Sequence, residues 1–173
     1  MANFSAIVRT DEEFEDAVAP CPAELDRERL KGTNVNPVTL LATDFLNPFN
    51  EVEMVLDLLP SCPDYFEEIA SWRPRNYRDH FAHSSLRHGK LALEAYDYVS
   101  AEVRDMFDDV VERLNRTAAR AIATARAALA TRDSDVIATR CAGAAGELRA
   151  LIGEAGGVIN GTALRKIKRN GPA

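Results

Sequence analysis

The chain has 173 residues, of which 46% are hydrophobic and 28% are charged, as is typical of one soluble globular domain. No apolar run approaches the roughly eighteen residues of a membrane span, and the first residues do not resemble a secretory signal, so we expect a cytoplasmic protein. The net charge of −6 makes nucleic-acid binding an unfavoured function, because such proteins usually carry a basic excess.

Charge and proline content both divide the sequence near its middle. Residues 1–72 carry 15 acidic and 4 basic side chains, whereas residues 73–173 carry 12 acidic and 17 basic ones. Seven of the eight prolines lie at or before Pro74, and residues 75–171 contain none. Because proline disrupts helix interiors, long helices are predicted in the second half of the chain.

Residues 1–35 are acidic and contain few large apolar side chains, which predicts a poorly ordered arm or one that orders on docking. Asn36 followed by Pro37 is typical of a helix start. The next apolar positions recur at spacings of three and four, which predicts one helical face with a kink or a division near Pro48. These positions are Leu41, Phe45, Phe49, Val52, Leu56 and Leu59.

Two further helices are predicted at capping signals. Ser61, followed by Asp64, predicts a short aromatic helix, and Asn76, followed by Asp79, predicts a helix that contains all three histidines. The aromatic residues of this region are expected to form core or, alternatively, an apolar pocket beside Pro48 for a ligand or a partner helix. The candidate pocket residues are Phe45, Phe49, Phe66, Trp72 and Phe81.

A long helix is predicted across residues 90–130. It would measure about 60 Å at roughly 1.5 Å per residue. That length exceeds a compact domain of this size, so the helix is either broken or protrudes and packs against a second copy. Its apolar positions follow a heptad spacing, which predicts a coiled-coil-like interface whose disruption by aspartate should dissociate an assembly. The candidate interface residues are Val103, Phe107, Val110, Leu114, Ala121 and Ala128.

A last helix is predicted from Asp133 or Ser134 to the glycine pair at 156–157. No segment alternates with a period of two, so strands have little support. The expected class is all-α: an antiparallel helical bundle with one long helix, either protruding or coiled-coil-like. The bundle is expected to span residues 36–158, followed by a basic tail over residues 159–173.

The three histidines lie within nine residues of one another. On a helix His80 and His83 are one turn apart, and with Asp79 they could bind zinc or iron, whereas His88 points away. Carboxylates from the helix after Pro48 would have to complete this site, because no HExxH or Glu-x-x-His motif occurs. A phosphotransfer histidine is an alternative, and ordinary helix residues are the simplest interpretation.

The alanine-rich segment over residues 125–145 resembles phasins, the helical coat proteins of polyester storage granules, in composition but without a specific motif. That resemblance implies an amphipathic coat of a granule or membrane surface. The leading hypothesis is different: a non-enzymatic helical protein, in a regulatory or scaffold role, that forms a homodimer or binds a helical partner. It requires no cofactor, whereas the histidine alternative requires zinc, iron or a phosphoryl group.

Overall fold

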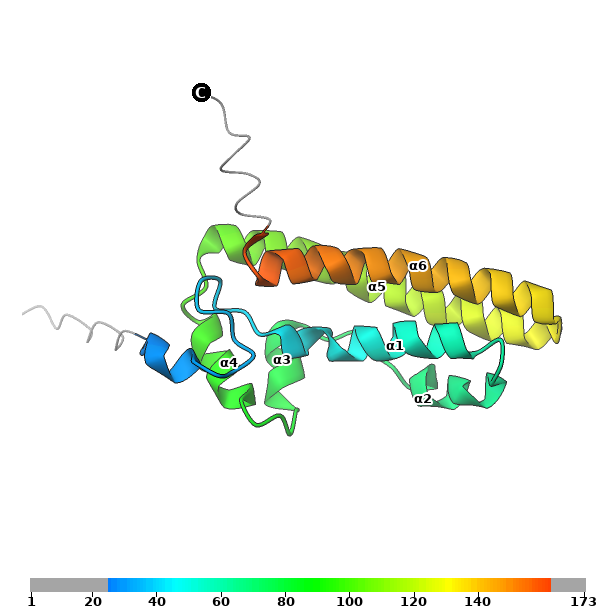
Figure 1. The fold of residues 1–173 in the computed structure, drawn as a ribbon, viewed down its shortest axis with the longest axis horizontal. Helices are drawn as coiled ribbons and strands as arrows, with labels where there is room; N and C mark the ends of the chain where they lie inside the picture. The colour runs from blue at the N-terminus through cyan, green and yellow to red at the C-terminus, as the bar shows by residue number, and fades with distance from the viewer. Residues whose placement is uncertain (1–24, 163–173) are drawn as a thin grey trace, which may run out of the picture.

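Figure 1 shows the computed structural model of the protein, which describes residues 25–162. The class is all-α, as predicted, and no strand occurs in this part of the chain. None of its helices is both long and apolar enough to cross a bilayer. The helices, in chain order, are η1 (Arg27–Leu30), η2 (Thr43–Leu46), α1 (Asn47–Leu58), η3 (Pro63–Tyr65), α2 (Phe66–Ala70), α3 (Tyr77–Ala82), α4 (Gly89–Tyr96), α5 (Ala101–Thr131) and α6 (Ser134–Ile159).

The two longest helices, α5 and α6, form an antiparallel hairpin that runs the length of the molecule (Figure 1). Arg132 adopts a left-handed conformation, with a φ of 57°, and ends α5. Asp133 then caps α6, as predicted, because its carboxylate accepts from the amide N of Asp135 at 3.0 Å and of Val136 at 3.1 Å. Ion pairs at 2.6 Å join the two helices at Arg113–Glu154 and Arg120–Glu147.

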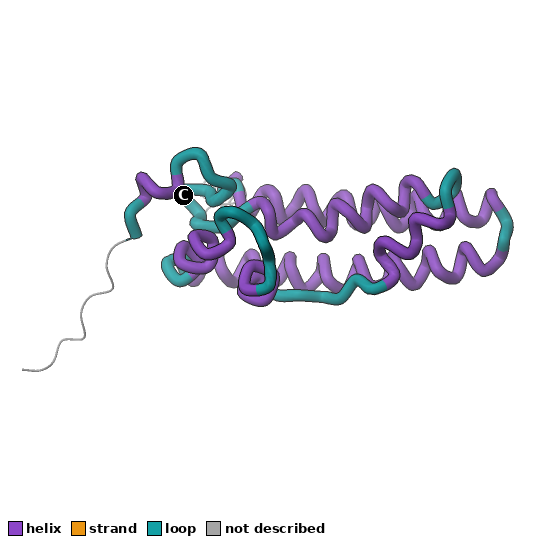
Figure 2. Tube along the Cα trace, turned by 90° about the horizontal axis from the view of Figure 1, so that it is seen from below, coloured by secondary structure: helices purple, strands orange, loops and turns teal. Residues whose placement is uncertain are grey.

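The predicted helix across residues 90–130 is broken. α4 ends at Tyr96, and Ser100 starts α5 by accepting a hydrogen bond from the amide N of Val103 at 3.4 Å. At about 1.5 Å per residue, the 31 residues of α5 extend about 46 Å, and the 26 residues of α6 run alongside most of that length. Figure 2 shows α3 and α4 crossing one end of this hairpin.

The six predicted interface residues on α5 are buried inside the single chain. Their exposed fractions range from 0% at Phe107 and Leu114 to 5% at Val103. α6, α1 and α2 pack against α5. The stripe therefore packs against helices of its own chain, so these residues have almost no exposed area for a second copy.

The first half of the chain packs on one side of this hairpin. The predicted helix start at Asn36 is wrong: its side chain accepts from the amide N of Val38 and Thr39, at 2.8 and 3.0 Å, which forms a turn instead. The predicted division near Pro48 is confirmed, since η2 ends at Leu46 and Pro48 lies in the first turn of α1. All six apolar positions predicted for this face are buried.

The described part of the predicted acidic arm, residues 25–35, packs against the bundle. Leu25, Leu30 and Val35 are buried there, and a two-pronged ion pair of 2.6 and 2.8 Å joins Arg29 to Glu94 of α4. The packed region therefore begins before residue 36. Residues 1–24, the rest of the predicted arm, and residues 163–173, most of the predicted basic tail, lie outside the described residues.

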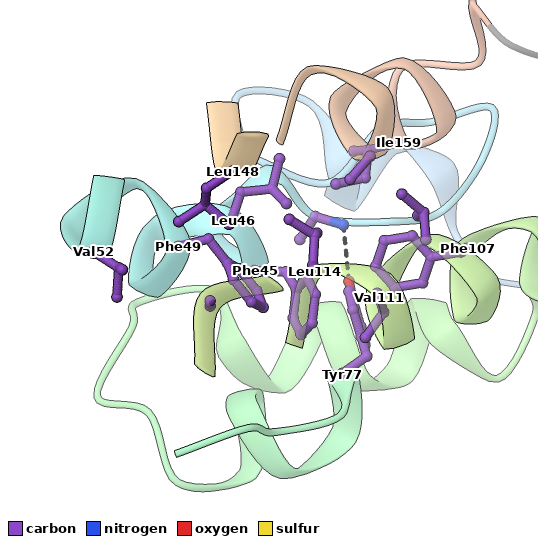
Figure 3. Packing of buried hydrophobic residues seen from close by; sticks show 14 of the residues in the cluster. Phe45, Leu46, Phe49, Val52, Tyr77, Phe107, Val111, Leu114, Leu148 and Ile159 are labelled. Carbon is purple, nitrogen blue, oxygen red and sulfur yellow. Dashed lines mark hydrogen bonds between the residues drawn. The ribbon is translucent and has the colours of Figure 1, made fainter. Parts of the chain in front are cut away.

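The predicted helix stop at the glycine pair is two residues too early, because α6 continues to Ile159. A residue far away in sequence holds this end: the Thr39 hydroxyl donates to the carbonyl of Ile159. Next to it lies the aromatic centre of the core (Figure 3), where the Tyr77 hydroxyl accepts a hydrogen bond from the amide N of Ala42 at 2.8 Å.

Candidate ligand pocket

A pocket of about 260 Å³ lies between the start of α1, the end of α2, the link from α2 to α3, and α3 itself. The link runs alongside the long helices (Figure 2) and is attached to α5, because the side-chain amide of Asn115 donates to the carbonyl of Arg75 at 3.2 Å. The lining residues are Phe45, Pro48, Phe49, Glu51, Glu68, Ile69, Ser71, Trp72, Arg73, Arg75 and His80.

Aromatic rings form much of the pocket wall. The ring centroids of Phe45 and Phe49 lie 5.7 Å apart, and those of Phe49 and Trp72 lie 5.9 Å apart in an edge-to-face arrangement. Both distances fall within the range of favourable aromatic pairs. Phe45 and Phe49 are buried, whereas Trp72 is partly exposed, so the wall extends from the core to the surface.

His80 forms the inner polar end of the pocket. Asn76 caps α3 as predicted, accepting from the amide N of Asp79 at 2.8 Å, and this start directs His80 into the core. The imidazole is 8% exposed and packs edge-on against Phe45, with ring centroids 5.5 Å apart. Its Nε2 atom is buried and has no hydrogen-bond partner among residues 25–162.

The surroundings of His80 favour the neutral imidazole. Burial, and after it the positive charge of Arg75, lower the pKa of His80 below its usual 6.5, while the charge and a backbone hydrogen bond of Asp44 act in the opposite direction. The backbone hydrogen bond of Asp44 raises the pKa because a carbonyl oxygen accepts from a ring N–H. That ring nitrogen is not Nε2, since Nε2 has no partner. The proton is therefore assigned to Nδ1, and Nε2 is a free acceptor.

The rim of the pocket is charged but formally balanced. Arg73 and Arg75 contribute two positive side chains, and Glu51 and Glu68 contribute two negative ones. One guanidinium N–H of Arg73 donates to the carbonyl of Trp72 at 2.7 Å, which holds that arginine along the link. With neutral His80, the lining has no net formal charge.

No family model, no curated protein and no solved structure matches this chain. The chemistry of the pocket is therefore the basis on which a function can be assigned.

Three of the five aromatic residues predicted for the pocket line it, namely Phe45, Phe49 and Trp72. The other two pack elsewhere. Phe66 lies at the start of α2, where its ring receives the guanidinium of Arg126 at 5.4 Å. Phe81 turns into the core, where its ring centroid lies 4.7 Å from that of Tyr77.

The structure does not assemble the predicted metal ligands. α3 ends at Ala82, so His83 leaves the helix and is exposed, with its Nδ1 2.9 Å from the carbonyl of Asp79, whereas His80 is buried. Glu53 and Asp57 of α1 pair with Arg149 of α6. Within residues 25–162, no three His, Cys, Asp or Glu side chains are grouped as zinc or iron ligands would be.

Proposed function

We propose that this protein is a non-enzymatic binding protein that takes a small, uncharged, ring-sized ligand into the pocket between α1, α2 and α3. The pocket carries this proposal because it interrupts the packed core with a wall of aromatic side chains beneath a balanced rim. Ligand sites usually measure about 300–1,000 Å³, so a pocket near the lower limit suits a single ring.

The environment of His80 supports binding over catalysis. A general base that activates a nucleophile lies within hydrogen-bond reach of it. In the described part of the chain, the buried Nε2 of His80 has no such hydroxyl or thiol partner. The imidazole is therefore arranged to receive a group from outside the chain.

Trp72 provides a direct test, because it is the single tryptophan of the chain and lines the pocket. Phenol titrated into the protein should change Trp72 fluorescence saturably. Ser71→Phe, which adds a ring at the lining, should weaken this response about tenfold or more, equivalent to about 1.4 kcal/mol. Ser61→Phe makes the same change at an exposed position that does not line the pocket, and should leave the response intact. A titration without saturation would contradict the proposal.

Self-association or binding of a helical partner stays a prediction and requires a surface other than the buried stripe on α5. The exposed apolar side chains include Met54 and Leu58, one turn apart on α1, with exposed fractions of 55% and 39%. Light scattering across micromolar concentrations tests self-association, and a strict monomer that captures no partner would contradict both forms of the hypothesis.

The remaining hypotheses have separate tests. Phosphotransfer requires an accessible histidine, which His83 supplies and buried His80 does not. Incubation with a phosphoryl donor, followed by mass spectrometry, would detect a phosphohistidine. Co-sedimentation with lipid vesicles or polyester granules tests the surface-coat hypothesis.

A further inference from the structure

We infer that the pocket selects ligands that present a hydrogen-bond donor, a hydroxyl or a ring N–H, to the Nε2 atom of His80. This inference rests on the proposed binding function and specifies its ligand class. The ligand would be a neutral, phenol-like molecule whose ring lies along the aromatic wall, with its donor directed inward.

The first reason is the lack of a partner for Nε2. Buried polar atoms in proteins are nearly always hydrogen-bonded, because an unpaired one loses its interaction with water without compensation. Nε2 is one of three such atoms among the described residues, with Nε of Arg104 and Oδ1 of Asn115, and it is the one whose side chain lines the aromatic pocket. A ligand that fills this cavity and donates to Nε2 removes the deficit.

The second reason is the direction of the hydrogen bond. A neutral imidazole with its proton on Nδ1 accepts at Nε2 and has no proton to donate there. Asp44 faces the ring from η2 and Arg75 faces it from the link; the arginine charge and the burial of the ring both disfavour imidazolium. An ether or a ketone oxygen would therefore face another lone pair, whereas a hydroxyl group would complete the bond.

The third reason is the arrangement of rings and charges around the cavity. Phe45 contacts the His80 ring, and Phe49 contacts the Trp72 ring, so the aromatic wall connects the inner end of the pocket to its outer end. A carboxylate ligand would meet Glu51 and Glu68, and an ammonium ligand would meet the two arginines. A neutral donor avoids both repulsions.

Phenol and anisole are suitable probes, because they share a ring and differ in whether the oxygen carries a proton. With Trp72 fluorescence as the signal, we expect phenol to bind the wild-type protein about 3–10-fold more tightly than anisole, the effect of one net hydrogen bond. His80→Leu, of similar volume, should reduce this preference to about one. His83→Leu, which replaces an exposed histidine outside the pocket, should preserve it.

The wild-type comparison requires no variant, so a variant that fails to fold does not affect it. The nitrogen chemical shifts of the His80 ring supply a second readout: phenol should shift the Nε2 resonance and anisole should not. Equal affinity for phenol and anisole would overturn the donor inference and leave the binding function standing. If neither molecule binds, both the inference and the proposed function are wrong.

Discussion

Tyr77 shows how one polar atom organises the aromatic centre of this fold. Its ring stacks on Tyr96 with centroids 4.5 Å apart and meets Phe107 edge-on at 5.6 Å (Figure 3 shows Tyr77 and Phe107). Its hydroxyl oxygen accepts from the amide N of Ala42, in the turn before η2. Tyr77 therefore connects α3 to α5 through its ring and to the first half of the chain through its oxygen.

Replacing Tyr77 with phenylalanine should lower the free energy of unfolding by about 1–3 kcal/mol, because the buried amide N–H of Ala42 loses its acceptor while the ring contacts remain. Urea denaturation measures this loss. Tyr65→Phe is the matched control, because Tyr65 is 48% exposed. It should lower the free energy of unfolding by at most a few tenths of the loss expected for Tyr77→Phe. Equal stabilities of the two variants would show that the Tyr77 hydrogen bond contributes little.

The burial of His80 predicts a dependence of stability on pH. The unfolded chain protonates His80 near pH 6.5, whereas the folded chain does so only at lower pH, because burial lowers its pKa. Below pH 6.5 the unfolded state therefore binds more protons than the folded state, and the free energy of unfolding decreases as the pH falls. Above pH 6.5 His80 is neutral in both states, so this loss of stability is absent there. Urea denaturation at a series of pH values, for the wild type and His80→Leu, measures it.

Comparing the wild type with that variant isolates His80, because all other titrating groups are shared. The stability difference between the two proteins should change between neutral pH and mildly acidic pH, in the direction that disfavours the wild type in acid. A difference that is constant over this range would contradict the burial of a neutral imidazole.

Part of the pocket could be predicted from individual residues. Helical spacing identified Phe45 and Phe49, and clustering drew attention to His80, for which the sequence predicted metal binding; the described residues do not group further ligands around it. Ile69 and Arg75 were missed as lining residues, because their positions depend on how α2 and the link to α3 pack against α5. Contacts between distant segments leave no periodic signal in the sequence.

At the scale of single helices, α6 contains several glycines, which are unfavourable in a helix interior. Gly143, Gly146 and Gly153 lie within it, are exposed, and face open space where a Cβ atom would be. Glycine weakens a helix interior, because it loses more backbone freedom on folding than other residues. Nothing in the described part of the chain contacts these three positions closely enough to require glycine.

Gly143→Ala and Gly146→Ala should each raise the free energy of unfolding by about 0.5–1 kcal/mol, the usual advantage of alanine in a helix. Thermal and urea denaturation measure the gain. Gly89→Ala is the contrasting variant: its Cβ would lie 3.0 Å from the hydroxyl oxygen of Ser84 and 3.4 Å from the carbonyl of Phe81, so no gain is expected there. A loss of stability at Gly143 or Gly146 would contradict the open space at these positions, as when a second copy of the chain packs on that face.

Helix ends were predictable where the signal was local. The caps at Asn76 and Asp133 involve amides within three residues, and the division near Pro48 follows from the shape of the proline ring. The predictions failed at Asn36 and at the glycine pair at 156–157. There, a turn with its own side-chain hydrogen bonds and a contact to Thr39 from far away in sequence determine the backbone.

At the scale of the molecule, the heptad spacing on α5 predicted a buried face, and that face is buried. The sequence assigned it to a second copy or a partner protein, whereas α6, α1 and α2 of the same chain pack against α5. A spacing pattern shows that a face is buried, without showing whether the same chain or a second copy covers it. The charge asymmetry was more informative. Glu53 and Asp57 of the acidic half pair with Arg149 of the basic half, so the two parts of the chain meet through opposite charges.

Combining Val110→Asp with Leu114→Asp, expected from the sequence to dissociate an assembly, should instead unfold the chain. Both residues are at most 1% exposed, and each buried, unpaired carboxylate costs several kcal/mol, out of a total stability of about 5–15 kcal/mol. Circular dichroism and light scattering together distinguish the two results. Arg116→Asp, on the exposed face of α5, is the control for added charge. A folded, fully helical double variant would contradict the burial described above.

The packing of α1 against α6 has a consequence for how the protein is made. Glu53 and its partner Arg149 are 96 residues apart, and α1 relies on α6 to cover its apolar side chains. At about 5–20 residues per second of synthesis, α1 leaves the ribosome roughly 5–20 s before α6. During that interval the apolar face of α1 has no α6 to pack against, so α1 reaches its packed state only after α6 has been synthesised.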